Sequence, residues 1–187
     1  MGSARFELTK VTPKCGAEVH GIDLSQPLDD AQIQTLQEAL AAHCVLFFRD
    51  QRMTPEQQKA FGRRFGELHL HPAWPRLLEG HPEIMEIYAD KDTKRIAGED
   101  WHTDVSCDPE PPLGTILYML EVPSEGGDTL FSSMVAASAA LPLRASALPR
   151  TPVQTESMVG TLCVMHCCTP MRIKGSARSS SSFSIHI

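Results

Sequence analysis

Residues 101–134 read WHTDVSCDPEPPLGTILYMLEVPSEGGDTLFSSM, and the interpretation of the whole chain starts from this stretch. His102 and Asp104 are one residue apart, and on an extended strand such residues point to the same face. The pair can therefore offer one nitrogen and one oxygen to a common first-row metal ion. Trp101 is expected to pack in the core beside them. A lone pair of this kind is more often a surface hydrogen bond, so its meaning depends on the flanking sequence.

The sequence around this stretch predicts more strands than helices. Short apolar strands bounded by Gly, Pro or polar turns are expected at 6–13, 17–24, 44–50, 83–89, 114–122 and 125–131. A helix is expected over 28–43, with an aspartate N-cap and apolar residues at helical spacing. A second helix over 54–67 opens with a capping box formed by Thr54 and Gln57 and is expected to end at Gly66. This pattern predicts an α+β fold with a β-sandwich or barrel core.

The composition argues against several classes of protein. A chain of 187 residues with 42% hydrophobic and 21% charged residues is typical of one globular domain. The net charge of −6 argues against nucleic acid or an anionic membrane as a partner. No apolar run is long enough to span a bilayer, and the N-terminus lacks the apolar segment of a secretory signal. Six cysteines without regular spacing favour a reducing compartment, so we expect a soluble cytoplasmic protein.

The flanks of His102 and Asp104 resemble the iron-binding segment of the taurine dioxygenase (TauD/TfdA) family of 2-oxoglutarate-dependent dioxygenases. The shared features are W-H-[ST]-D, a Pro-Pro pair, an apolar strand, V-P and G-G-D-T. Upstream, GAEVHGIDLSQPL (16–28) and VLFFRDQRMTPEQQKAFGRRFGELHLHP (45–72) resemble the same family in the same order. Several motifs in register are far more specific than one short motif. The resemblance covers about residues 5–142 and implies a double-stranded β-helix (jelly-roll) core with N-terminal helices, incomplete in this chain.

The resemblance also implies roles for individual residues. His102 and Asp104 match the first two Fe(II) ligands of the family, and Thr129 matches the threonine whose hydroxyl binds a carboxylate of 2-oxoglutarate. His71 matches a histidine that contacts the substrate sulfonate, and Trp74 lies where the taurine enzymes place a tyrosine near the substrate. The ordinary alternative for Thr129 is a residue that favours a β-strand, and the ordinary alternative for His71 is a loop histidine that caps a carbonyl. The departure at Trp74 leaves a sulfonate or another small anion as the expected substrate.

A third iron ligand is needed to complete the site. The family takes this histidine from a segment reading W-D-N-x-x-x-x-H, followed by an arginine that pairs with 2-oxoglutarate. TLCVMHCC at 161–168 resembles the end of that segment, so His166 is the candidate third ligand and Arg178 the candidate partner of 2-oxoglutarate. The Trp-Asp-Asn is absent, and so is the stretch that carries the middle core strands. A zinc site formed by His166 and the nearby cysteines is the alternative, although adjacent cysteines do not match the usual zinc spacing.

Residues 143–187 differ in composition from residues 1–142. The tail has one acidic residue, Glu156, against five basic ones, a net charge of +4 that leaves −10 for residues 1–142. It has one aromatic residue, Phe183, and a serine-rich end. Few apolar side chains mean little burial to offset the entropy of ordering. We therefore expect a partial dioxygenase domain over 1–142 and an atypical tail over 143–187 that is either disordered or the product of a frameshift.

Three functions follow from these expectations. The first is an Fe(II)- and 2-oxoglutarate-dependent dioxygenase that uses O2 to hydroxylate a small anionic, sulfonate-like substrate, as in taurine catabolism. The second is a truncated, catalytically inactive relative with weak or no iron binding. The third is a non-enzymatic binder of small anions that uses His71. Neither nucleic acid nor a membrane is expected as a partner, and a homo-oligomer is compatible with each function.

Overall fold

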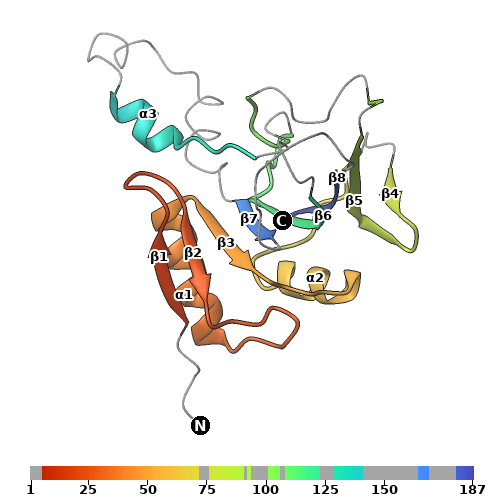
Figure 1. The fold of residues 1–187 in the computed structure, drawn as a ribbon, viewed down its shortest axis with the longest axis horizontal. Helices are drawn as coiled ribbons and strands as arrows, with labels where there is room; N and C mark the ends of the chain where they lie inside the picture. Colours follow the sequence, from red (N-terminus) through yellow and green to blue (C-terminus); the bar gives the residue numbers. More distant parts are fainter. Residues whose placement is uncertain are drawn as a thin grey trace.

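A mixed eight-stranded sheet forms the centre of the computed structural model, which describes residues 6–71, 76–90, 92–93, 101–105, 108–122, 129–140, 164–168 and 180–187 (Figure 1). The strand order within these residues is β1-β2-β3-β7-β6-β8-β5-β4. The strands are β1 (Glu7–Lys10), β2 (Ala17–His20), β3 (Val45–Arg49), β4 (Leu77–Leu78), β5 (His81–Ala89), β6 (Thr115–Glu121), β7 (Val164–Cys168) and β8 (Ser180–His186). The strands expected at 6–13, 17–24, 44–50, 83–89 and 114–122 therefore correspond to β1, β2, β3, β5 and β6.

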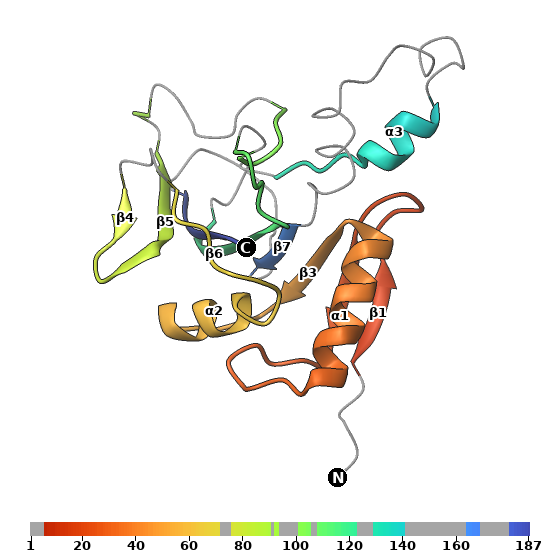
Figure 2. The ribbon, with the colours of Figure 1, turned by 180° about the vertical axis from the view of Figure 1, so that it is seen from behind.

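Two capped helices pack on the sheet, and a third helix follows β6 in the sequence. α1 (Asp30–His43) contacts β3, and α2 (Pro55–Gly62) contacts β5, as the reverse view shows (Figure 2). The predicted aspartate N-cap of α1 and the predicted capping box of α2 are confirmed, since the side chains of Asp29 and Thr54 accept hydrogen bonds from backbone N–H groups three residues later. α3 (Met134–Ala140) has no buried residue.

The second helix is shorter than the sequence predicted. α2 ends at Gly62, and the expectation that it would run to Gly66 is wrong. The N–H of Phe65 bonds to the carbonyl of Gly62 at 2.9 Å, an i to i−3 bond that tightens the chain into a turn. Helix propensity alone favours a continuation of α2 beyond Gly62. The chain turns here instead, and the Phe65 ring packs against the Phe61 ring with centroids 5.2 Å apart.

Segments far apart in the sequence meet in the middle of the sheet. β3 pairs in parallel with β7, β7 in parallel with β6, and β8 runs antiparallel between β6 and β5. β7 and β8 belong to the compositionally atypical tail, so two segments of that tail lie within the sheet. The division at residue 142 stays a prediction.

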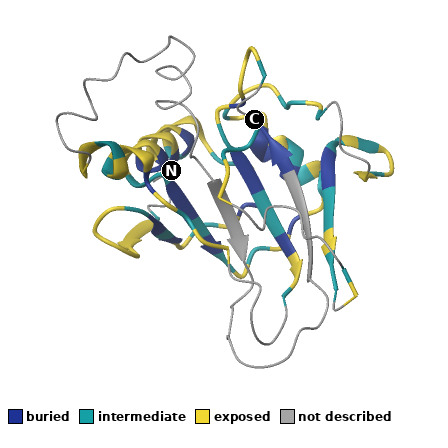
Figure 3. Ribbon diagram, turned by 90° about the horizontal axis from the view of Figure 1, so that it is seen from above, coloured by how far each residue is buried: buried dark blue, intermediate teal, exposed yellow. Residues whose placement is uncertain are grey.

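The core lies where the first helix covers the parallel strands. Ile33, Leu36 and Leu40, the apolar stripe predicted for the first helix, are all buried, and they join Phe48 and Ile185 in one apolar cluster. Figure 3 shows buried residues along the inner strands, while the described loops around them are intermediate or exposed. Burying each large aliphatic side chain contributes roughly 2 kcal/mol before the entropy of ordering is subtracted.

Two sequence expectations are not met in the described residues, one for Trp101 and one for the strand at 125–131. Trp101 is 71% exposed, so the expectation that it packs in the core is wrong. Residues 125–128 fall outside the described residues, and residues 129–131 lie outside any strand. The strand expected at 125–131 is therefore not observed in its described part. Among the described residues, no helix is long and apolar enough to cross a bilayer.

Candidate functional site

His102 and Asp104 do lie together, although not for the reason that the sequence suggested. Residues 101–103 are irregular and Asp104 begins a turn, so the expected extended strand is wrong. Nε2 of His102 is nevertheless 3.1 Å from Oδ1 of Asp104. Val105, with φ of 50°, takes the left-handed conformation that closes this turn. Both side chains are accessible, His102 at 52% and Asp104 at 32%, so a ligand can reach the pair from solvent.

Thr115, the first residue of β6, holds the carboxylate of Asp104. Its hydroxyl donates to Oδ2 of Asp104 at 2.8 Å, and the residue is only 5% exposed. Because β6 is paired on both sides, by β7 and β8, the position of this hydroxyl is fixed by the sheet. A buried hydroxyl on a rigid strand therefore fixes the orientation of a carboxylate that lies in a turn.

His186, the last residue of β8, approaches the same carboxylate from the neighbouring strand. The register pairs His186 with Thr115, and Nε2 of His186 lies 3.7 Å from Oδ2 of Asp104. His186 is 6% exposed, and its Nδ1 is buried with no hydrogen-bond partner. Burial lowers the pKa of His186 to about 4, against the opposing charge of Asp104. The imidazole is therefore neutral at pH 7, which is the form that binds metals.

Two further histidines surround His186. The ring centroids of His71 and His186 are 6.0 Å apart, and those of His69 and His186 are 6.3 Å apart. The backbone N–H of His69 donates to the carbonyl of His186 at 3.0 Å. Nε2 of His69 is 3.2 Å from Oδ2 of Asp108, whose pKa is lowered by the backbone N–H of Glu110 and by His69. The structure thus brings four histidines (His69, His71, His102 and His186) and two aspartates (Asp104 and Asp108) to one end of the β6–β8 pair.

The other predicted site residues are placed differently. Thr129 is exposed in an irregular segment. Trp74 and Arg178 lie outside the described residues. The register of β7 places His166 beside Phe47 of β3 and Leu117 of β6, two residues along β6 from Thr115.

The donor atoms fit part of an iron site. Two ligands with bonds of about 2.1 Å at right angles place their donor atoms about 3 Å apart. The 3.1 Å between His102 and Asp104 matches this spacing, and the 3.7 Å between His186 and Asp104 is longer. In the part of the chain that the structure describes, no group of three or more His, Cys, Asp or Glu is arranged to hold a metal ion. His102 and Asp104 therefore have the spacing of two metal ligands. His186 lies near Asp104 but does not complete a three-ligand site.

Sequence reasoning missed Thr115, His69 and His186. The pair His69 and His71 at i and i+2 in HLHP carried a usable signal, because alternate residues of an extended segment share a face. No sequence pattern indicated a role for His186, which lies in a serine-rich segment without a motif. Thr115 lies eleven residues after Asp104, outside the motif, and the pairing of β6 with β8 sets it opposite His186.

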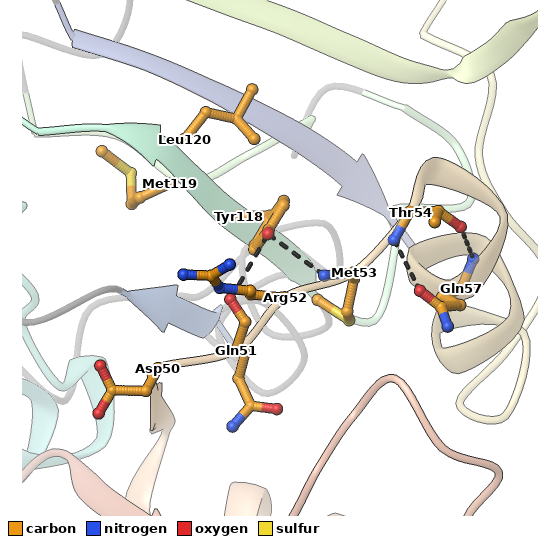
Figure 4. Close-up of a pocket in the computed structure, with 9 residues that line it drawn as sticks. All are labelled: Asp50, Gln51, Arg52, Met53, Thr54, Gln57, Tyr118, Met119 and Leu120. Atoms are coloured by element: carbon orange, nitrogen blue, oxygen red, sulfur yellow. Dashed lines mark hydrogen bonds between the residues drawn. The ribbon is translucent and has the colours of Figure 1, made fainter.

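A separate cavity of about 570 Å³ opens beside the segment that joins β3 to α2 (Figure 4). The hydroxyl of Tyr118 accepts a hydrogen bond from the N–H of Met53 at 3.2 Å and donates to the carbonyl of Gln51 at 3.5 Å. The lining residues are Asp50, Gln51, Arg52, Met53, Thr54, Gln57, Tyr118, Met119 and Leu120. None of the predicted site residues lines this cavity, so it does not enter the site described above.

Comparison with known proteins identifies relatives of this arrangement. The family model described as "Taurine catabolism dioxygenase TauD, TfdA family" matches residues 7–150. The chain is 41% identical over 143 residues to an alpha-ketoglutarate-dependent dioxygenase of Penicillium expansum, an alignment that covers 71% of this chain and 38% of the relative. It is 34% identical over 148 residues to an alpha-ketoglutarate-dependent sulfonate dioxygenase of Saccharomyces cerevisiae, with 71% and 34% covered.

The fold is shared with a solved structure as well. A taurine dioxygenase from Burkholderia xenovorans superposes with a TM-score of 0.67 at 24% sequence identity, covering 97% of this chain and 82% of that one. This likeness concerns the mixed α/β fold. The chain spans less than half the length of the two curated relatives it matches above.

Proposed function

The chain belongs to the TauD, TfdA family of taurine catabolism dioxygenases, and from this premise we propose that it acts as an Fe(II)- and 2-oxoglutarate-dependent dioxygenase on a small anionic, sulfonate-like substrate. The observation that carries the proposal is the 3.1 Å between Nε2 of His102 and Oδ1 of Asp104. This pair stands in the family motif and has the spacing of two cis metal ligands. We extend the proposal to a jelly-roll core, to a cytoplasmic location and to the domain division at residue 142.

In this proposal His102 and Asp104 hold Fe(II), and Thr115 keeps the Asp104 carboxylate in place. The metal, when bound with 2-oxoglutarate, supplies the activation of O2 that side chains cannot provide. The protein contributes the orientation of the ligands and a partly buried setting. His71 offers an N–H donor to the anionic group of the substrate, and its ring lies 6.0 Å from that of His186. Thr129 is retained as the proposed contact to 2-oxoglutarate, as is Arg178.

The third donor has two candidates. We favour His186, because its neutral imidazole is 3.7 Å from Asp104 and its register position is opposite Thr115. His166, the residue indicated by the sequence, stands on the neighbouring strand beside Leu117, two residues further along β6. A small closing movement of His186 toward Asp104 suffices to bring its Nε2 to the spacing of a ligand, which is about 3 Å.

Substitution of the two histidines separates these candidates. His186→Gln is expected to weaken Fe(II) binding about tenfold or more, while His166→Gln changes it less than about twofold, because only one of them supplies a donor atom. Anaerobic titration of the metal-free chain with Fe(II) measures both affinities. Weaker binding in His166→Gln alone would return the third position to His166.

Thr115 gives a subtler prediction. Thr115→Val removes the hydroxyl at nearly constant volume and is expected to lower Fe(II) affinity by about tenfold, because the Asp104 carboxylate loses its fixed orientation. Thr115→Ser retains the hydroxyl and is expected to bind within about threefold of the unmodified chain. Equal affinities in the valine and serine variants would show that the hydrogen bond does not support the site.

Turnover itself is tested by succinate formation. The chain, supplied with Fe(II), 2-oxoglutarate and O2, is expected to release succinate faster when taurine, an alkyl sulfonate or an alkyl sulfate ester is present. Omission of Fe(II) is expected to stop the release. Iron binding without any substrate-stimulated succinate would contradict the proposed activity.

A second candidate function is a metal-binding but inactive family member. It is favoured by one observation: in the described residues, the close donor pair is not part of a group of three that could hold a metal ion. Two protein ligands are expected to bind Fe(II) markedly more weakly than a complete triad. A titration that reaches only weak binding, with no succinate formed, would support this function over the first.

A further inference from the structure

Two cysteines stand side by side where β2 and β3 begin. β2 and β3 run in parallel with Ala17 paired to Leu46, so Cys15 and Cys44 each lie two residues before this pair, at the start of the two strands. The N–H of Gly16 donates to the carbonyl of His43 at 2.8 Å and joins the two segments at this point. Neighbouring strands lie about 4.8 Å apart, and a disulfide needs Cα atoms about 4.4 to 6.8 Å apart. Cys15 and Cys44 are the chain neighbours of the two residues joined by this hydrogen bond, so the two backbone segments are close enough for a disulfide to bridge them.

Hydrogen bonds hold both cysteines in place. The hydroxyl of Thr12 accepts from the N–H of Cys15 at 2.9 Å and donates to the carbonyl of Cys15 at 2.6 Å. Gly16 follows with φ of 89°, a conformation that glycine adopts without strain. On the other side, Cys44 caps α1, and its N–H donates to the carbonyl of Leu40 at 2.8 Å. The two thiols are thus presented by a fixed turn and a fixed helix end.

The surroundings of the pair indicate thiols that interact with each other. Both cysteines are free and partly buried. Burial raises the pKa of the Cys15 thiol, and the nearby charge of a Cys44 thiolate raises it further. Sγ of Cys44 is 3.9 Å from the hydroxyl of Ser133, a weak contact that leaves the sulfur able to react. The influence of Cys44 on the pKa of Cys15 agrees with the hydrogen bond between Gly16 and His43, which holds the two segments together.

We propose that Cys15 and Cys44 are a reversible oxidation site, in which a disulfide oxidant converts two neighbouring thiols into one intramolecular disulfide. With oxidised glutathione, one cysteine thiolate attacks the S–S bond and releases one reduced glutathione. The second cysteine then displaces the other glutathione from the mixed disulfide. The protein loses two protons and two electrons, and the electrons reduce one oxidised glutathione to two thiols. None of the residues of the His102–Asp104 site takes part, so this inference does not depend on the proposed activity.

The bond would fasten the β1–β2 turn to the junction of α1 and β3. These two places are 29 residues apart in sequence, and α1 lies between them. Closing such a loop restricts the unfolded chain, so the oxidised protein is expected to melt on the order of 5 to 10 °C higher than the reduced one. In a reducing compartment the thiols stay free, and the bond forms when the glutathione pool becomes oxidised.

The experiment uses the full chain with oxidised glutathione in native buffer, followed by proteolysis without reduction and mass spectrometry. The chain has six cysteines, so the readout is the identity of the linked peptides. The expected result is a dominant Cys15–Cys44 linkage that dithiothreitol reverses. Cys15→Ser and Cys44→Ser are expected to lose both the linkage and the rise in melting temperature, and to accumulate a mixed disulfide with glutathione on the remaining cysteine.

Three outcomes would overturn the proposal. The first is a Cys15–Cys44 linkage that forms only in denaturant, and the second is stable separate glutathione adducts on both residues of the unmodified chain. The third is a rise in melting temperature that persists in either serine variant. Circular dichroism of the reduced variants, expected to match the reduced unmodified chain, shows that the substitutions have not simply unfolded the protein.

Discussion

Asp104→Asn is expected to lower Fe(II) affinity by at least about 100-fold and to abolish Fe(II)-dependent succinate formation. Asparagine has nearly the same shape and can still accept the hydrogen bond that Thr115 donates at 2.8 Å. The substitution therefore removes the negative charge and the stronger donor oxygen while it preserves the turn. A divalent hard cation loses most of its attraction to the pair when the carboxylate becomes an amide.

Asp108→Asn is the matched control for this prediction. Asp108 is also a carboxylate beside a histidine, with Oδ2 3.2 Å from Nε2 of His69. Its histidine partner, His69, is not a proposed ligand, so the control is expected to change Fe(II) affinity less than about threefold. Anaerobic titration gives both affinities, and circular dichroism verifies folding. Equal losses in the two variants would mean that general charge, and not coordination by Asp104, accounts for the binding.

The metal-free chain is expected to lose roughly 2 to 3 kcal/mol of folding stability between pH 6.5 and pH 4.5 through His186 alone. Burial lowers the pKa of this imidazole from the ordinary 6.5 to about 4. The unfolded chain therefore takes up a proton in this range that the folded chain does not. The stabilising contribution is complete well above pH 6.5, declines as the pH falls through 6.5, and reaches its minimum below about pH 4, where both states are protonated.

Urea unfolding at pH 6.5, 5.5 and 4.5 measures this loss, and His186→Gln is the comparison. Glutamine cannot titrate, so the variant is expected to show a shallower decline over the same range. Carboxylates with lowered pKa, such as Asp108 and Glu83, contribute mainly below this window, because their ordinary values are 3.8 and 4.5. Parallel declines in the variant and the unmodified chain would exclude His186 as the cause.

The sequence predicted local structure well wherever the signal was local. The aspartate N-cap and apolar stripe of α1, the capping box of α2 and five strands depend on residues that are neighbours in the chain. The end of α2 was predicted incorrectly, because the turn after Gly62 is held by distant residues: the Arg64 side chain donates to the carbonyl of Leu28, and the Arg64 carbonyl accepts from the Gln37 side chain. Trp101 was misplaced for a related reason, since an aromatic residue beside a motif predicts burial only if another element covers it.

The candidate site, like the fold, was predicted from the sequence only where its signal was local. The H-x-D spacing and its flanking motifs led from the sequence to His102 and Asp104 and to the family. Their 3.1 Å approach comes from a turn and not from the strand that the spacing suggested. The role predicted for His166 remains a prediction.

The sequence by itself determined the family, the two residues of the motif and the local elements, because each of these is written in contiguous residues. Only the tertiary structure decided which groups surround Asp104. Thr115 is eleven positions away and His186 more than eighty, and the pairing of β6 with β8 brings both to the same carboxylate. Strand pairing between distant segments depends on the whole sheet, so no local pattern could have identified these neighbours.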